Sequence, residues 1–266
     1  MSPQMFAVFV VAFLASLLGP LCGIGGGVII KPVVDAMGVL PVATVSFLSS
    51  ISVLTMSAAT LLQNAAAKTS SIDAKKMLPL ALGSAAGGVA GKMAFNALSA
   101  GLPDTELVGA VQAAILIALT AVVAVYTVRR DHVQSLHIES PATSAAIGAA
   151  AGACWSFLGI GGGPFNLAIL TFFFAMDTKP AAQASLFIIA FSQTASLIYS
   201  LVRGSVPAFA SWLLVGMCTA AVAGSVMGRQ LAKRADSKMV DRLYLFALGL
   251  IALICCYNFC RFSGII

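Results

Sequence analysis

The sequence predicts an all-α polytopic membrane protein with two inverted repeats, each a glycine-broken helical hairpin plus three transmembrane helices. Of its 266 residues, 60% are apolar and 9% are charged, whereas a soluble domain carries about 25% charged residues. Several runs without charge are as long as a membrane-spanning helix, which needs about 20 residues. One five-residue glycine motif also occurs in each half of the chain. These observations exclude the soluble classes, and the continuous apolar runs disfavour membrane-spanning strands.

The apolar runs divide the chain into eight blocks separated by charged residues, proline or glycine. In chain order the blocks are 5–38, 40–66, 77–99, 106–128, 141–176, 180–202, 206–230 and 241–261. The first and fifth blocks are too long for one span. Each contains Gly-Ile-Gly-Gly-Gly, at 23–27 and at 159–163. Because each glycine destabilises a helix by about 1 kcal/mol relative to alanine, we expect each long block to be a broken hairpin.

The sequence around the glycine motif is also duplicated. The two motif copies are offset by 136 residues, and further matches follow at offsets of 139 and 137. The later matches pair Pro41, Ala43, Ser46, Thr55, Ser57, Gly87, Gly91, Lys92 and Asp104 with Pro180, Ala182, Ser185, Thr194, Ser196, Gly224, Gly228, Arg229 and Asp241. A co-linear series of this kind indicates an N-terminal repeat, 1–135, and a C-terminal repeat, 136–266.

The basic residues indicate the topology. If the two long blocks are hairpins that enter and leave on the same side, eleven of the 15 basic residues lie inside, as the positive-inside rule requires. Those eleven are Lys68, Lys75, Lys76, Arg129, Arg130, Lys179, Arg229, Lys233, Arg234, Lys238 and Arg242. Three spans then remain in each half, and this odd number inverts one half relative to the other. Inverted repeats with broken helices near the midplane are a transporter design.

Small residues recur every four positions in the predicted spans. One such series is Gly83, Gly87 and Gly91, and another is Gly216, Ala220, Gly224 and Gly228. Small residues at this spacing allow helix backbones to approach closely in lipid. We therefore expect close helix packing along both series.

The two breaks are the candidate binding site. Backbone N–H groups at membrane depth must face protein, water or substrate. New helices are expected to start at Gly27 and at Gly163, where Pro164 suits a first helical position. Helix starts carry free N–H groups and partial positive charge, which attract anions. The alternative is that the glycines serve as hinges or close-packing points.

The expected substrate-binding residues combine the glycines with polar side chains on neighbouring segments. Such polar side chains also form helix-to-helix hydrogen bonds in membranes. The set comprises Gly25, Gly26, Gly27, Lys31, Ser46, Ser50, Gly161, Gly162, Gly163, Asn166, Ser185 and Gln193.

Lys31 is the one basic residue in this set. It lies one turn after Gly27, in a block otherwise free of charge until Asp35. It could offer a full positive charge to an anion. The alternative is that it extends to the interface and pairs with Asp35 at i, i+4.

The glycine motif, the following Pro32 and the duplication over nearly the full chain resemble the TauE/SafE family. The resemblance implies a multi-pass transporter of the bacterial inner membrane, usually an exporter, for sulfite, sulfoacetate or other organosulfonates. The second copy departs from the first, since Ala168 stands where the offset of 136 places Pro32. We therefore expect the two breaks to differ in geometry.

We expect a transporter that works by alternating access at the interface of the repeats. The nine acidic residues all map to block edges or loops, so no carboxylate relay is expected, and an inside-negative potential favours anion export. The alternatives are an anion channel or an importer of a sulfur oxyanion such as thiosulfate, which Cys22 could contact.

We expect no enzymatic activity, cofactor or metal. The expected partners are a small anion and the bilayer, without nucleic acid, and a homodimer is left open.

Overall fold

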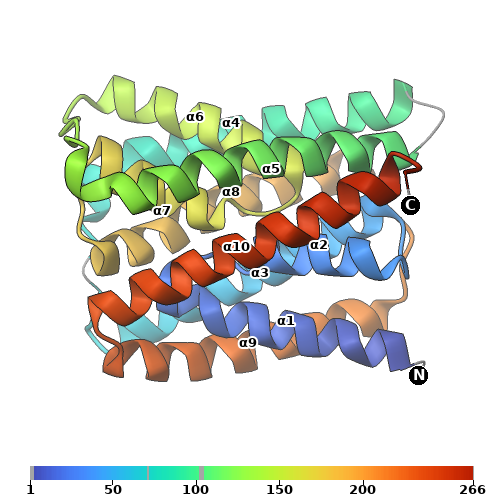
Figure 1. The fold of residues 1–266 in the computed structure, drawn as a ribbon, viewed down its shortest axis with the longest axis horizontal. Coiled ribbons are helices and arrows are strands. Elements are labelled where there is room, and N and C mark those ends of the chain that lie inside the picture. The colour runs from blue at the N-terminus through green and yellow to red at the C-terminus, as the bar shows by residue number, and fades with distance from the viewer. Residues whose placement is uncertain (1–2, 71, 102–104, 266) are drawn as a thin grey trace.

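The computed structural model describes residues 3–70, 72–101 and 105–265, and these residues form helices without a strand. Figure 1 shows long helices lying side by side, with both termini at one end of the molecule. In chain order the helices are α1 (Pro3–Cys22), α2 (Gly27–Met37), α3 (Val42–Ala66), α4 (Ala74–Gly101), α5 (Thr105–Arg129), the 3-10 turn η1 (Arg130–His132), α6 (Pro141–Leu158), α7 (Gly163–Phe173), α8 (Thr178–Val202), α9 (Ser211–Arg234) and α10 (Ser237–Phe262).

Six helices of the described chain are long and apolar enough to cross a membrane: α1, α3, α5, α8, α9 and α10. The fold class predicted from composition is therefore confirmed as an all-helical, multi-pass membrane protein. Five of these helices are predicted spans, whereas α1 is the first arm of the predicted hairpin 5–38 and has 20 residues. The predicted span 77–99 lies within α4, whose glycines and Lys92 lower its hydropathy.

Each glycine motif ends one helix and begins the next. α1 and α2 form one hairpin, and α6 and α7 form the other. Arg261, near the C terminus, donates from Nη1 to the carbonyls of Asp35 and Ala36 at the end of α2, so both ends of the first hairpin lie at the end of the molecule that holds the termini (Figure 1). In the second hairpin, Leu136 and Ile138 ahead of α6 donate backbone hydrogen bonds to the end of α7. Each hairpin therefore returns to the end from which it starts.

The predicted small-residue series form two parallel helix contacts. A Cβ on Gly87 would meet the backbone of Ala149, and Gly83 and Gly91 face Ala145 and Ala153 in the same register, so α4 packs closely against α6. Backbones this close gain dispersion contacts that a larger side chain would prevent.

The α1–α9 contact matches the α4–α6 contact. Gly224 faces Phe13, and Gly228 faces Leu17. The sequence offsets relate the two contacts: 137 residues separate Gly87 from Gly224, and 136 residues separate Phe13 from Ala149. The same offsets relate the pair Gly91–Ala153 to the pair Gly228–Leu17. The predicted duplication requires this correspondence.

Two pairs of helices that the predicted repeat makes equivalent lie antiparallel. Gly109 at the start of α5 lies against Phe262 at the end of α10. The start of α3 shares a cavity with the end of α8, and the end of α3 shares another cavity with the start of α8. An inverted repeat places equivalent helices in opposite directions. The inverted repeat stays a prediction, and the antiparallel arrangement of these two helix pairs is the one that such a repeat requires.

We expect Gly87→Ala to lower stability by about 1–3 kcal/mol, because the new Cβ would overlap backbone that cannot move aside alone. The predicted observation is a lower melting temperature of the detergent-purified protein. Gly249→Ala is the matched control, since Gly249 is helical and has no atom within 4 Å of an added Cβ. Equal melting temperatures for the two variants would contradict the close α4–α6 contact.

Candidate anion site at the glycine breaks

The two glycine breaks meet inside the helix bundle. A Cβ on Gly163 would lie 3.0 Å from the amide nitrogen of Gly25, and a Cβ on Gly27 would lie 2.5 Å from the carbonyl oxygen of Ile160. Residues 21–30 and 158–167 are all buried. The structure therefore brings the predicted glycines of both halves into one place.

Several backbone amides at the breaks have no hydrogen-bond acceptor within the described chain. The amides of Gly26 and Gly27 donate to Ile24 and Gly25. The amides of Gly25, Gly161 and Gly162 make no such bond to a described residue. Buried N–H groups without an acceptor are rare in proteins. Three of them at one contact form a site that an anion would satisfy.

Two helices begin at this contact. α2 begins at Gly27 and α7 begins at Gly163, followed by Pro164, as the sequence predicted. Helix starts carry partial positive charge, so both helices favour an anion between them. The breaks differ in backbone geometry: all of Gly159, Gly161, Gly162 and Gly163 have positive φ, whereas in the first break Gly23 has a φ of 65° and the glycines from 25 to 27 stay outside the left-handed region.

α3 and α8 cover the contact with apolar side chains. A Cβ on Gly161 would lie 2.7 Å from Val53 of α3, and one on Gly25 would lie 2.6 Å from Ile189 of α8. In this conformation apolar side chains fill the space beside these glycines, so an anion requires Val53 and Ile189 to move aside.

Ser46 and Ser185 occupy matching positions beside the two breaks. Ser185 of the second half donates to the carbonyl of Gly23 in the first half at 3.0 Å. Ser46 of the first half lies against Gly159 in the second half, and its hydroxyl has no partner among the described residues. These predicted residues thus contact the backbone that leads into each break.

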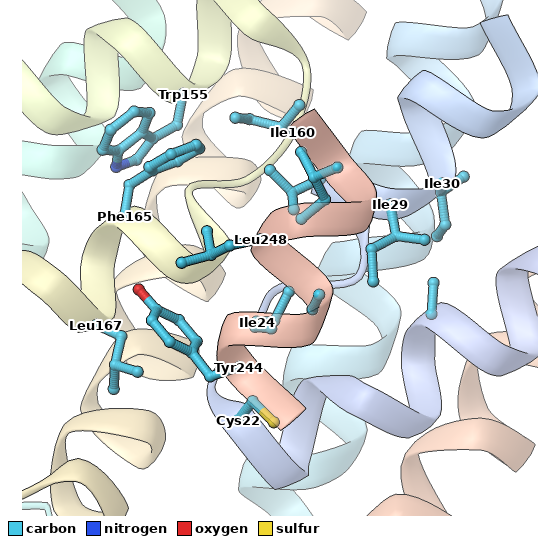
Figure 2. Close-up of a cluster of buried hydrophobic side chains, with 14 of the residues drawn as sticks. Cys22, Ile24, Ile29, Ile30, Trp155, Ile160, Phe165, Leu167, Tyr244 and Leu248 are labelled. Carbon is cyan, nitrogen blue, oxygen red and sulfur yellow. The ribbon is translucent and has the colours of Figure 1, made fainter. Parts of the chain in front are cut away.

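Asn166 and the helix α10 stabilise the second break. Trp155 donates to Asn166 Oδ1 at 2.7 Å and stacks on Phe165. Tyr244 of α10 donates to the carbonyl of Pro164 at 2.6 Å. Figure 2 shows Trp155 and Phe165 side by side, with Tyr244 and Leu248 nearby. The Asn166 amide nitrogen has no partner among the described residues, so one donor remains for a ligand.

Lys31 forms an ion pair rather than facing the amides as a free charge. Its ammonium lies 2.6 Å from the Asp35 carboxylate, and both side chains are buried. A buried pair of this kind is neutral overall, and removing one partner leaves a costly isolated charge. The second interpretation of Lys31, the i, i+4 pair, therefore describes this structure, although the pair is buried instead of lying at the interface.

Cys22 lies on the α10 side of the first break. Its thiol approaches the carbonyl of Val240 at 3.9 Å. All six cysteines are free, and the described residues contain no group of three or more His, Cys, Asp or Glu that could hold a metal. A contact between Cys22 and a sulfur substrate stays a prediction.

A cavity of about 250 Å³ lies on one side of the breaks. We call it the Arg229 cavity, and three basic residues line it: Lys179, Arg229 and Lys233. Arg229 donates to Asn64 at 2.6 Å and to Thr69 at 3.2 Å. Ala182 joins the cavity to the first break, because it lines the cavity and touches Gly23. The sequence indicated Lys179 and Lys233 only as topology signals, and Arg229 as a topology signal and as the repeat partner of Lys92, although each lies at the end of an apolar block.

A second cavity of about 10 Å³ lies on the other side of the breaks. We call it the Lys92 cavity, and the predicted residues Ser50 and Gln193 line it together with Lys92. Along α3 the two linings are separated by residues 55–59, and along α8 they are separated by residues 187–192. The predicted set is therefore divided, with the glycines in the centre and Ser50 and Gln193 to one side.

The sequence profile named Sulfite exporter TauE/SafE matches residues 8–255, nearly the whole chain. No curated protein and no solved structure matches. The matched range includes both glycine breaks and both cavities.

We expect Lys31→Met to destabilise the protein by about 3–5 kcal/mol, because Asp35 would be left as a buried unpaired charge. The double variant Lys31→Met with Asp35→Leu should recover most of this loss in melting temperature. If the double variant also transports as the wild type does, Lys31 serves the fold and not the substrate. A double variant as unstable as the single one would contradict the neutral-pair interpretation.

Proposed function

Because the chain belongs to the TauE/SafE family of sulfite exporters, we propose that it exports sulfite or an organosulfonate across the bacterial inner membrane. The family and the helical architecture describe a multi-pass membrane transporter of sulfur-containing anions. We propose in addition that the substrate is sulfite or an organosulfonate, that the direction is export and that the mechanism is alternating access.

The observation that carries the proposal is the set of buried amides at Gly25, Gly161 and Gly162, which have no acceptor among the described residues. Amide donors beside two helix starts suit the oxygens of a sulfite or sulfonate group. They supply positive potential without a charged side chain, so the site also releases its anion more readily than a buried lysine would. Proteins that carry a solute need this intermediate strength of binding.

Alternating access is the mechanism that the two cavities support. The Arg229 cavity has about 250 Å³, whereas the Lys92 cavity has about 10 Å³, so this conformation favours access from the side of Arg229. That side also carries Arg130 and Lys179, which line a neighbouring cavity and belong to the predicted cytoplasmic loops. In the proposed cycle, inverted repeats exchange the two shapes, and the anion passes the breaks between them.

A channel would need a path that stays open through the breaks. Val53 and Ile189 pack on the glycines from both sides, which favours a carrier. Saturable flux without unit conductance in planar bilayers is the corresponding expectation.

We expect purified protein in liposomes to carry sulfite, and Gly25→Ala to reduce the rate by about tenfold or more, since the added methyl would overlap Ile189 and crowd the breaks. Isotope flux of sulfite, sulfoacetate, taurine, thiosulfate and sulfate measures the substrate range. Gly249→Ala is the control for an added methyl on an open helix face. If Gly25→Ala folds and transports normally, the anion does not bind at the breaks.

We expect the flux to respond to membrane potential. Each negative charge that leaves an inside-negative vesicle gains about 2.3 kcal/mol per 100 mV, which corresponds to an about fifty-fold shift in the distribution at equilibrium. A potassium-diffusion potential of graded size tests this dependence with sulfoacetate as substrate. A distribution that ignores the potential would contradict uniport and indicate a coupled ion.

A further inference from the structure

Lys92 is a buried cation without a carboxylate partner in the described chain. Its residue is 8% exposed, and it lies in α4 between helices. The described ion pairs join other residues, and the contact found for the Lys92 ammonium is the ring of Phe95 at 5.0 Å. A lysine inside a membrane protein usually pairs or marks the route of a solute. Lys31 pairs with the Asp35 carboxylate, whereas no described carboxylate pairs with Lys92.

Gln193 lines the same cavity with an unsatisfied side chain. It is 1% exposed, and neither its amide oxygen nor its amide nitrogen has a partner among the described residues. A buried amide that makes no hydrogen bond is expensive, and a ligand removes this penalty. Ser50 adds a hydroxyl to the same wall. One cation and two neutral donors therefore surround a cavity of about 10 Å³.

The Lys92 cavity corresponds to the Arg229 cavity through the predicted repeat. The offset of 137 that relates Gly87 and Gly91 to the second half also relates Lys92 to Arg229. The offset of 139 relates Phe47, which lines the Lys92 cavity, to Leu186, which lines the Arg229 cavity. Both cavities are bounded by α3 and α8. The Lys92 cavity adds Lys92 from α4, and the Arg229 cavity adds Arg229 and Lys233 from α9.

We propose that Lys92, Gln193 and Ser50 form a second anion-binding site, which is the far-side counterpart of the Arg229 cavity. The site is nearly closed in this conformation and opens when the Arg229 cavity closes. It takes the same class of ligand, a small sulfur oxyanion or sulfonate, which Lys92 holds by charge while Gln193 and Ser50 donate hydrogen bonds. The inference rests on the proposed transport function and adds the place from which the anion leaves.

The test compares Lys92→Met with Lys76→Met in liposomes that carry the protein in one orientation. Lys76 lies on the same helix with a side chain 79% exposed, so its loss removes an equal charge from the surface. Sulfite is the probe, and the half-saturating concentration is measured by exchange from each side. For Lys92→Met we expect that concentration to rise about tenfold or more on the side opposite Arg229, with a smaller change on the Arg229 side. Lys76→Met should match the wild type, and Gln193→Leu should show a weaker form of the Lys92→Met defect.

A second measurement separates this inference from the transport function. Sulfite should raise the melting temperature of detergent-purified wild type more than that of Lys92→Met, with chloride at equal ionic strength as the reference. A wild type that sulfite stabilises more than Lys92→Met, but that does not carry sulfite, would overturn the proposed transport and support the site. A Lys92→Met protein that folds, is stabilised and exchanges from both sides like the wild type would overturn the site.

Discussion

The structure depends on one constraint, which is that backbone N–H groups cannot remain unpaired in an apolar interior. Each of the two helical hairpins has a break in its backbone hydrogen bonding, and the two breaks pack against each other. Glycine is required there because the contact distances leave no room for a side chain, as at Gly27 against the Ile160 carbonyl. The amides of Gly25, Gly161 and Gly162 have no acceptor within the part of the chain that the structure describes, and the proposed anion chemistry follows from these unpaired donors.

Charge is distributed around this centre in a graded way. The breaks contribute only partial charges, while full positive charges lie to either side, at Arg229 in one cavity and at Lys92 in the other. An anion moving through the protein would pass from a full charge to dipoles and again to a full charge. Lys31 does not belong to this series, because Asp35 neutralises it. On the proposed function, binding at each stage would thereby be moderate, which suits a protein that must also release its solute.

The sequence predicted the helical fold, the positions of both breaks and the starts of α2 and α7, because glycine and proline act locally and apolar length is set by the bilayer. It also identified the small-residue contacts of Gly83, Gly87 and Gly91. It did not identify which amides remain unpaired, since that depends on local turns such as the one from Gly27 to Gly25. The sequence left open whether Lys31 binds an anion or pairs with Asp35, and only the side-chain geometry shows the pair with Asp35. The basic residues of the Arg229 cavity already satisfy the positive-inside rule as loop residues. The sequence therefore held no separate indication that they also line a cavity.

The close glycine contacts join helices from different halves of the chain: α4 packs on α6, and α1 packs on α9 (Figure 1). The first arm of each hairpin is therefore fastened to the opposite half. On the duplication that the sequence predicts, a single half has no surface of its own for that arm, so an ancestral polypeptide of half this length would have needed a second, upside-down copy in order to fold. The present chain would then derive from an antiparallel pair of such polypeptides, which exchanged hairpin arms before their genes were fused.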